Sequence, residues 1–179
     1  MGNFKEDIAQ CEALVLDVDG VFTDGGITPT QDGDFIRTYN CKDGYAVAYA
    51  VKLGYKVCII SGGRGSNLRY RMGMLGIEDL YLDCTDKIAA IKEFCAKYSF
   101  DPQRLIYMGD DIPDLECMEF VGMGVAPNDA CMEVIEASRY VSEFGGGKGC
   151  VRDIVEQWLR SKGEWAKSKK GVAMGVPSR

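Results

Sequence analysis

The chain has 179 residues, a formal net charge of −6, eight cysteines and no histidine. A chain of this length buries about 70% of its unfolded surface, so we expect one domain over residues 1–179 that folds without disulfides or a structural metal. The absence of histidine excludes Ser-His-Asp and Cys-His catalysis and His-ligated zinc. The acidic balance argues against nucleic acid as a partner. It still permits an anionic substrate, because one metal ion and a few cations can invert the local charge.

The cysteines predict a reducing compartment. They are scattered without a Cys-x-x-Cys pair, and Cys58 lies inside an apolar run where a thiol packs as a small hydrophobic group. The N-terminus lacks the apolar region of a signal peptide, and no apolar stretch approaches the ~20 residues that span a bilayer. We therefore expect a cytoplasmic protein without a membrane partner.

Short apolar runs alternate with helical patterns along the chain. The expected strands span 13–16, 56–60, 80–82, 105–108 and 124–126. The expected helices span 44–53, 64–75, 86–98, 112–121, 130–137 and 151–159. Continuous apolar runs of this length are typical of strands buried on both faces. The alternation predicts an α/β sandwich with a doubly wound, Rossmann-like parallel sheet.

Two segments depart from this alternation. Residues 21–39 contain two turn signals, Asp24-Gly25-Gly26 and Asp32-Gly33, between short β-prone stretches. They predict a β-hairpin inserted after the first strand. The tail, about 163–179, has no clear apolar periodicity, so it is either a flexible terminus or a segment that orders against a neighbouring subunit.

Polar residues follow four of the expected strands, at the edge where open α/β sheets bind their ligands. In chain order they are Asp17 and Asp19, then Ser61, then Lys87 at the start of a helix, and finally Asp110 and Asp111. Each motif alone is weak, because Asp and Gly are common turn formers. Together and in order they make a purely structural role remote. Carboxylates gathered in one crevice repel unless a divalent cation lies among them, and oxygen ligands favour Mg²⁺.

By the order and spacing of these motifs, residues from about 12 to 160 resemble the haloacid dehalogenase (HAD) superfamily of phosphotransferases. The resemblance implies that Asp17 is the nucleophile that forms an aspartyl-phosphate. It implies that Asp19 is the general acid/base, which protonates the leaving alkoxide and then activates water. Ser61 would hold a phosphoryl oxygen, and Lys87 would balance the charge of the nucleophile and the phosphate.

The same resemblance implies an Mg²⁺ site formed by the carboxylates of Asp17 and Asp110 and the backbone carbonyl of Asp19. Asp111 and Asp114 would support these ligands. A catalytically silent relative has no reason to keep the full set of motif residues, whereas a phosphomutase or a hydrolase of another phosphate ester would keep it. Only an assay separates those last two from a sugar-acid phosphatase.

The intervals between the motifs leave no room for the cap domain of many superfamily members. A capless site is open, so a neighbouring subunit would have to shield the phosphoryl group from water. The chain is most similar in detail to the capless phosphatases of 3-deoxy-D-manno-octulosonate 8-phosphate (Kdo 8-phosphate). The matching segments are 17–25, 40–45, 75–77, 107–111 and 145–149 followed by Arg152. This resemblance implies an Mg²⁺-dependent homo-oligomer, a tetramer, that acts in lipopolysaccharide biosynthesis.

The resemblance also points to substrate contacts. One stretch that matches the family consists of Asn40, Cys41, Lys42, Asp43 and Gly44. The same stretch also fits the start of a helix with Asp43 as its N-cap, and the two interpretations are compatible because helix N-termini receive anions.

Further substrate contacts are expected from Asp19, Lys87, Gly63, Arg64 and Arg71. Arg64 and Arg71 lie on one helical face, where they either extend along the edge of the core or reach a sugar-acid carboxylate. Arg71 is the better candidate because it matches a family arginine. Phosphatases of nine-carbon 2-keto-3-deoxy sugar acid 9-phosphates carry Glu where this chain has Gly63, so we expect the eight-carbon acid to be preferred and keep the nine-carbon acid as the alternative. Lys148, in the Gly-rich loop 145–149, belongs either to a plain loop or to a neighbour's site.

Overall fold

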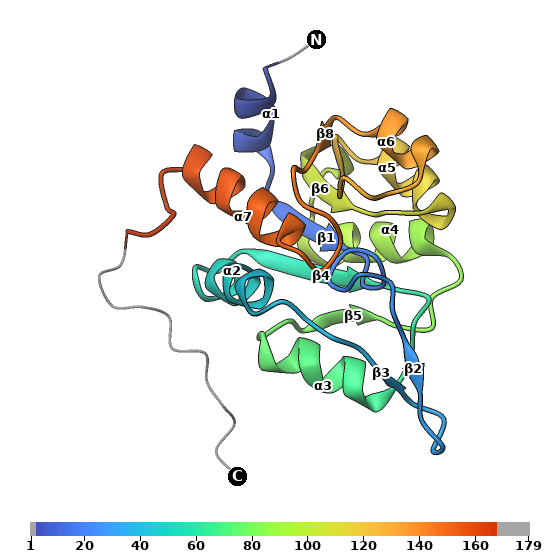
Figure 1. Ribbon diagram of the computed structural model, residues 1–179. Helices are drawn as coiled ribbons and strands as arrows, with labels where there is room; N and C mark the ends of the chain where they lie inside the picture. The colour runs from blue at the N-terminus through green and yellow to red at the C-terminus, as the bar shows by residue number, and fades with distance from the viewer. Residues whose placement is uncertain (1–2, 168–179) are drawn as a thin grey trace.

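The computed structural model describes residues 3–167, which form a six-stranded sheet between two layers of helices (Figure 1). All neighbouring strands are parallel, and their order is β5-β4-β1-β6-β7-β8. The strands are β1 Ala13–Leu16, β4 Lys56–Ile60, β5 Asp79–Tyr81, β6 Leu105–Met108, β7 Met123–Ala126 and β8 Tyr140–Val141. The expected doubly wound parallel sheet is confirmed. The edge strand β8 was not expected, because two residues are too short to give an apolar run.

The sheet is covered on both faces, and its central strand β1 is apolar and buried at every position. Leu14 and Leu16 of β1 pack toward one helical layer, and Ala13 and Val15 pack toward the other. The first layer consists of α1 Phe4–Gln10, α2 Cys41–Lys52, α3 Ser66–Met74 and α7 Cys150–Ser161. The second consists of α4 Lys87–Tyr98, α5 Leu115–Phe120 and α6 Met132–Ala137.

Several helix boundaries differ from those expected. Helix α2 begins at Cys41 instead of residue 44, because the Asn40 side chain accepts a hydrogen bond from the Lys42 amide at 2.8 Å. The interpretation of Asp43 as the N-cap is therefore wrong, and Asn40 is the cap. The segment 112–121 is a 3-10 turn, Ile112–Asp114, followed by the shorter helix α5. Helix α1 was not expected from the sequence.

The hairpin expected within residues 21–39 is present. Strands β2 Thr28–Pro29 and β3 Phe35–Ile36 pair antiparallel and project from the sheet beside α3 (Figure 1). The carboxylate of Asp34 ties the hairpin to the start of α3. It accepts hydrogen bonds from the Ser66 hydroxyl at 2.6 Å and from the Asn67 amide at 3.0 Å. The bond from Asn67 satisfies an orphan backbone donor of the first helical turn, and the two bonds together fix the hairpin on α3.

The connections are short, as the sequence predicted. Between Asp19 and Ser61 the chain forms the hairpin, α2 and β4, and between Ser61 and Lys87 it forms α3 and β5. Neither interval contains a cap domain. Among the helices of residues 3–167, none is long and apolar enough to cross a membrane.

The segment that follows α7 packs against the same chain as far as it is described. The Tyr49 hydroxyl donates to the Glu164 carbonyl at 3.1 Å, and the Tyr55 hydroxyl donates to the Glu164 carboxylate at 2.7 Å. The Trp165 ring lies edge-on to Tyr49. The beginning of the expected flexible tail is thus fixed on α2, whereas residues 168–179 lie outside the described part of the chain.

Candidate active site

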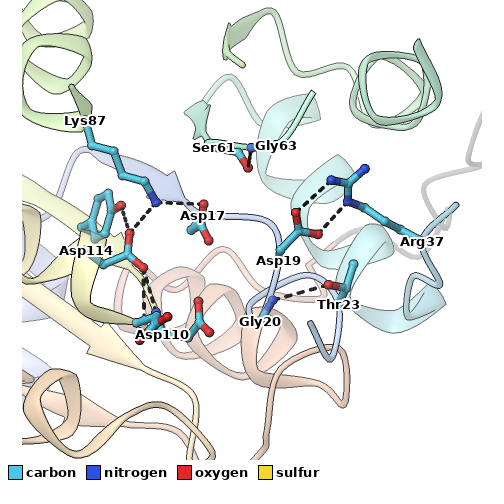
Figure 2. A network of polar contacts seen from close by, with 12 residues as sticks. Asp17, Asp19, Gly20, Thr23, Arg37, Ser61, Gly63, Lys87, Asp110 and Asp114 are labelled. Carbon is cyan, nitrogen blue, oxygen red and sulfur yellow. Dashed lines mark hydrogen bonds and ion pairs between the residues drawn. The ribbon is translucent and has the colours of Figure 1, made fainter. Parts of the chain in front are cut away.

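The polar residues that follow the strands meet at one edge of the sheet (Figure 2). Asp17 and Asp19 follow β1, Ser61 follows β4, Asp110 follows β6, and Lys87 begins α4. These five line one cavity of about 490 Å³, together with Gly63, Asp111 and Asp114. They converge because the carboxyl ends of parallel strands lie at the same edge of a sheet.

Lys87 bridges two carboxylates in this cavity. Its Nζ donates to Asp17 Oδ1 at 3.0 Å and to Asp114 Oδ1 at 2.7 Å. Burial alone would lower the pKa of Lys87, but the carboxylates of Asp17 and Asp114 outweigh this effect and raise the pKa. Lys87 therefore remains a cation beside Asp17 at neutral pH.

The carboxylates of Asp17, Asp110 and Asp114 carry more negative charge than Lys87 alone neutralises. Oxygens of Asp17, Asp110 and Asp114 lie within 4.8 Å of one another. Burial raises the pKa of Asp17 to about 6, with Lys87 opposing the rise. Burial, followed by the charges of Asp17 and Asp114, raises the pKa of Asp110 to about 7. These residues fit a hard divalent cation, because such an ion would relieve this repulsion with the oxygen ligands it prefers.

Asp114 differs from the other two carboxylates because its oxygens already have partners. It accepts from Lys87, from the Tyr107 hydroxyl and from the Asp110 amide. Asp114 thus fixes Lys87 and the backbone at Asp110. Asp111 is exposed, and its carboxylate accepts from the Ile112 amide at 2.8 Å, so it caps the 3-10 turn.

Asp19 is paired with an arginine that the sequence analysis did not identify. Arg37 Nε donates to Asp19 Oδ1 at 2.6 Å, and Arg37 Nη2 donates to Oδ2 at 2.9 Å. Arg37 follows β3, so it reaches Asp19 from the hairpin (Figure 2). No local motif marks this residue. The only signal was its place in a predicted hairpin next to the first motif.

Two sets of contacts hold the loop that carries Asp19 in place. The buried Thr23 hydroxyl accepts from the amides of Gly20 at 3.4 Å and Gly25 at 3.2 Å. The Gly-rich loop 145–149 approaches so closely that a Cβ at Gly146 would lie 2.0 Å from the Gly20 carbonyl oxygen. Glycine at 146 is required because only hydrogen fits in that space.

The five residues Asn40, Cys41, Lys42, Asp43 and Gly44 start α2 and do not line the cavity. Cys41 and Lys42 are exposed, and the buried Asp43 carboxylate accepts from the Arg152 amide of α7 at 2.7 Å. Asn40, besides capping α2, donates to the Gly147 carbonyl at 3.3 Å.

Two other predicted sugar contacts, Gly63 and Arg71, lie in different surroundings. Gly63 lies in the cavity, where a Cβ would be 2.8 Å from Arg37 Nη2 and 3.1 Å from Ser61 Oγ. Arg71 packs with its Cζ 5.4 Å from the centroid of the Tyr39 ring. It also approaches Gly44, where a Cβ would be 2.4 Å from Arg71 Nη2.

Two exposed cations lie outside the cavity lining. Arg64 is exposed in the loop before α3. Lys148 forms a surface ion pair with Asp24 of the same chain, with Nζ and Oδ2 3.1 Å apart.

Comparisons with known proteins agree with this geometry. The sheet topology and the polar edge are those of a haloacid dehalogenase-like hydrolase, and residues 76–149 match that family. A relative from Escherichia coli K12, a 3-deoxy-D-manno-octulosonate 8-phosphate phosphatase, is 35% identical over 156 residues, which cover 87% of this chain and 83% of the relative. The chain belongs to the family of 3-deoxy-D-manno-octulosonate 8-phosphate phosphatases.

Solved structures of that family share the fold. The enzyme from Yersinia pestis superposes with a TM-score of 0.86 at 33% identity, covering 89% of this chain and 86% of that one. The enzyme from Moraxella catarrhalis, in complex with magnesium ion, phosphate ion and KDO, gives a TM-score of 0.84 at 26% identity and covers 88% of this chain and 90% of that one.

Proposed function

We propose that this protein is a magnesium-dependent phosphatase that hydrolyses Kdo 8-phosphate to Kdo and inorganic phosphate in lipopolysaccharide biosynthesis. The observation that carries the proposal is the position of Lys87, whose cation lies 3.0 Å from Asp17 in a cavity that also contains Asp19 and Asp110. A carboxylate attacks a phosphate poorly because both are negative, and a fixed cation at this position reduces the repulsion.

Asp17 is the nucleophile in this mechanism. One of its oxygens forms a bond to phosphorus, and the bond from phosphorus to the leaving oxygen of the sugar breaks. Asp19 donates a proton to that leaving oxygen. In the second step, Asp19 takes a proton from a water molecule that attacks the aspartyl-phosphate, so that Asp17 is released as a carboxylate.

Mg²⁺ is the cofactor that fits the acidic residues. The carboxylates of Asp17 and Asp110 and the backbone carbonyl of Asp19 would hold it. When bound, the ion supplies positive charge opposite the transferred phosphoryl group. Ser61 provides a buried hydroxyl at the same edge for a phosphoryl oxygen, and it already accepts from the Gly63 amide at 3.0 Å.

Gly63 favours the eight-carbon acid over the nine-carbon one. Its place beside Ser61 and Arg37 leaves no room for a long side chain without displacing Arg37. A carboxylate acceptor for a longer, hydroxyl-rich sugar is therefore absent at this position, and the missing contact corresponds to about 5- to 150-fold in specificity. The nine-carbon sugar acid 9-phosphate remains the alternative substrate.

A cytoplasmic homotetramer is the assembly we propose. The phosphoryl site is open without a cap, and a neighbouring subunit is the economical way to exclude water from it. Under this proposal the sugar contacts from the start of α2, and from Arg64 and Arg71, are completed in the assembled protein.

The experiment that tests the function is phosphate release from a panel of phosphorylated sugar acids with Mg²⁺, with EDTA as the control. We expect kcat/KM to be highest for Kdo 8-phosphate and lower for the nine-carbon analogue. Equal values for the two substrates would contradict the eight-carbon preference. An absence of turnover on both would contradict the sugar-acid phosphatase itself.

A further inference from the structure

Arg37 engages both oxygens of the residue expected to transfer protons. Its Nε and Nη2 bind the two carboxylate oxygens of Asp19 side by side, at 2.6 and 2.9 Å (Figure 2). A planar fork of this kind fixes the plane and the rotamer of a carboxylate, which a single hydrogen bond does not. The Arg37 side chain is 3% exposed, while the Asp19 side chain is 29% exposed and faces the cavity. Arg37 therefore holds Asp19 from a buried position beside Gly63.

The pair has few other supports. The hydrogen bonds of Asp19 to side chains within residues 3–167 both come from Arg37. Across the cavity, Lys87 is occupied by Asp17 and Asp114. Without Arg37, the Asp19 side chain would rotate freely at the edge of an open cavity.

Stability alone does not explain a partly buried ion pair at this position. Such pairs contribute little net stability, because the desolvation of two charges offsets their attraction. Arg37 also keeps Nη1 buried without a hydrogen-bond partner among the described residues. An apolar side chain from the hairpin would fill the same space without these costs.

We propose that Arg37 is a positioning residue for Asp19, and that one role of the hairpin is to place Arg37 beside Asp19. The proposal rests on the proposed function, because it assumes that Asp19 protonates the leaving oxygen. Arg37 forms and breaks no covalent bond. It holds the Asp19 carboxyl where its proton passes to the sugar oxygen as the phosphorus–oxygen bond breaks and the bond to Asp17 forms.

The consequence is a dependence on the leaving group. A sugar alkoxide needs a proton when it leaves, whereas the nitrophenolate of p-nitrophenyl phosphate leaves without one. Loss of Arg37 should therefore slow transfer from an alkyl phosphate much more than transfer from p-nitrophenyl phosphate. A residue that served only to stabilise the fold would affect the two transfers equally.

The test measures single-turnover transfer with enzyme in excess and Mg²⁺ present, using Kdo 8-phosphate and p-nitrophenyl phosphate. Arg37→Met should slow transfer from Kdo 8-phosphate by about 10- to 100-fold, up to the loss caused by misplacing a reacting group by ~1 Å, and nitrophenolate release by less than about 3-fold. Arg37→Lys, which keeps the charge but not the fork, should fall between Arg37→Met and the wild type. Arg160→Met, an exposed arginine of α7, is the matched control and should change neither rate.

A second experiment tests the proposal even if Arg37→Met is less stable than the wild type. In an Asp19→Asn background, adding Arg37→Lys should cause no further loss, because both changes remove the same function. Equal slowing of both substrates, no slowing of either, or additive losses in the double variant would overturn the proposal. If the wild type does not hydrolyse Kdo 8-phosphate, the proposed function fails, and the same ratio measured on another sugar phosphate still decides the role of Arg37.

Discussion

At the residue scale, the site is a balance of charges around Asp17. Lys87 compensates Asp17 and Asp114 on one side, whereas Asp110 has no cation of its own among the described residues. Burial raises the pKa values of both Asp17 and Asp110, and Lys87 offsets only part of the rise. The arrangement is suited to a divalent cation held by these carboxylates.

The first prediction concerns the covalent step. Asp17→Asn should abolish turnover while the fold remains intact, because the amide is nearly isosteric with the carboxyl group but is a much poorer nucleophile. In the wild type, quenching during turnover and reducing the aspartyl-phosphate with borohydride should convert Asp17 to homoserine, measured by mass spectrometry of the peptide. Asp17 that stays unmodified by this treatment during turnover would contradict the covalent step.

The second prediction concerns protons and the metal. Because the folded pKa values of Asp17 and Asp110, about 6 and about 7, lie above the ordinary value, the metal-free folded protein binds more protons than the unfolded chain between pH ~4 and ~7. The contribution of these groups to stability therefore falls as the pH rises through this window. Urea unfolding with EDTA should show the fall, and Mg²⁺ should reduce it.

Asp110→Asn is the control for that experiment. It should remove much of the pH dependence of the metal-free protein and much of the stabilisation by Mg²⁺. Metal-free stability that rises from pH ~5 to ~7, with the same slope in Asp110→Asn, would show that this cluster does not control the linkage.

At the scale of elements, the start of α2 is a junction between α2, α7 and the segment that follows α7. Asp43 is buried, and its Oδ1 accepts the Arg152 amide in the first turn of α7. The Cζ of Arg152 lies 4.5 Å from the centroid of the Trp165 ring, so the same residue also contacts the segment after α7. This geometry explains the Asp43 position by the packing of two helices, while Asn40 and Gly44 connect the junction to the Gly-rich loop and to Arg71.

The third prediction separates that scaffold role from substrate binding. Asp43→Ala leaves a buried helix donor without its acceptor, which should lower the free energy of unfolding by about 1–3 kcal/mol. Urea denaturation measures this loss, with Lys52→Ala in the exposed last turn of α2 as the control. The KM for substrate should change little. Unchanged stability with a strongly raised KM would instead assign Asp43 to the substrate.

At the scale of the whole molecule, the active edge is open and the hairpin beside it carries exposed apolar side chains. Ile27 and Ile36 of the hairpin are 49% and 55% exposed, and Tyr70 of the adjacent α3 is 63% exposed. Exposed apolar groups near a site that must exclude water are typical of an interface between subunits.

The fourth prediction follows from that surface. Light scattering at assay concentration should report four subunits, and Ile36→Asp in the hairpin should shift the protein toward smaller species with reduced activity. The exposed control Met132→Asp, on α6, should leave the assembly intact. A fully active monomer would refute the shielding of the site by a neighbour.

The sequence by itself determined the sheet and the placement of the candidate site residues at the carboxyl ends of its strands. Consecutive apolar residues such as 13–16 predict a strand that is buried on both faces. A polar residue directly after a strand must lie at the carboxyl end of that strand. The positions of Asp17, Ser61 and Asp110 therefore followed from local pattern and chain order.

Only the tertiary structure decided how these residues are supported. Arg37 pairs with a residue 18 positions away and Asp43 with one 109 positions away, and no periodicity encodes either contact. Each contact depends on where a hairpin or a helix docks against the rest of the fold. Local patterns specify burial and turn chemistry, whereas the partner of a buried charge is fixed by packing between distant segments, so Arg37 and the junction at Asp43 became visible only in the folded chain.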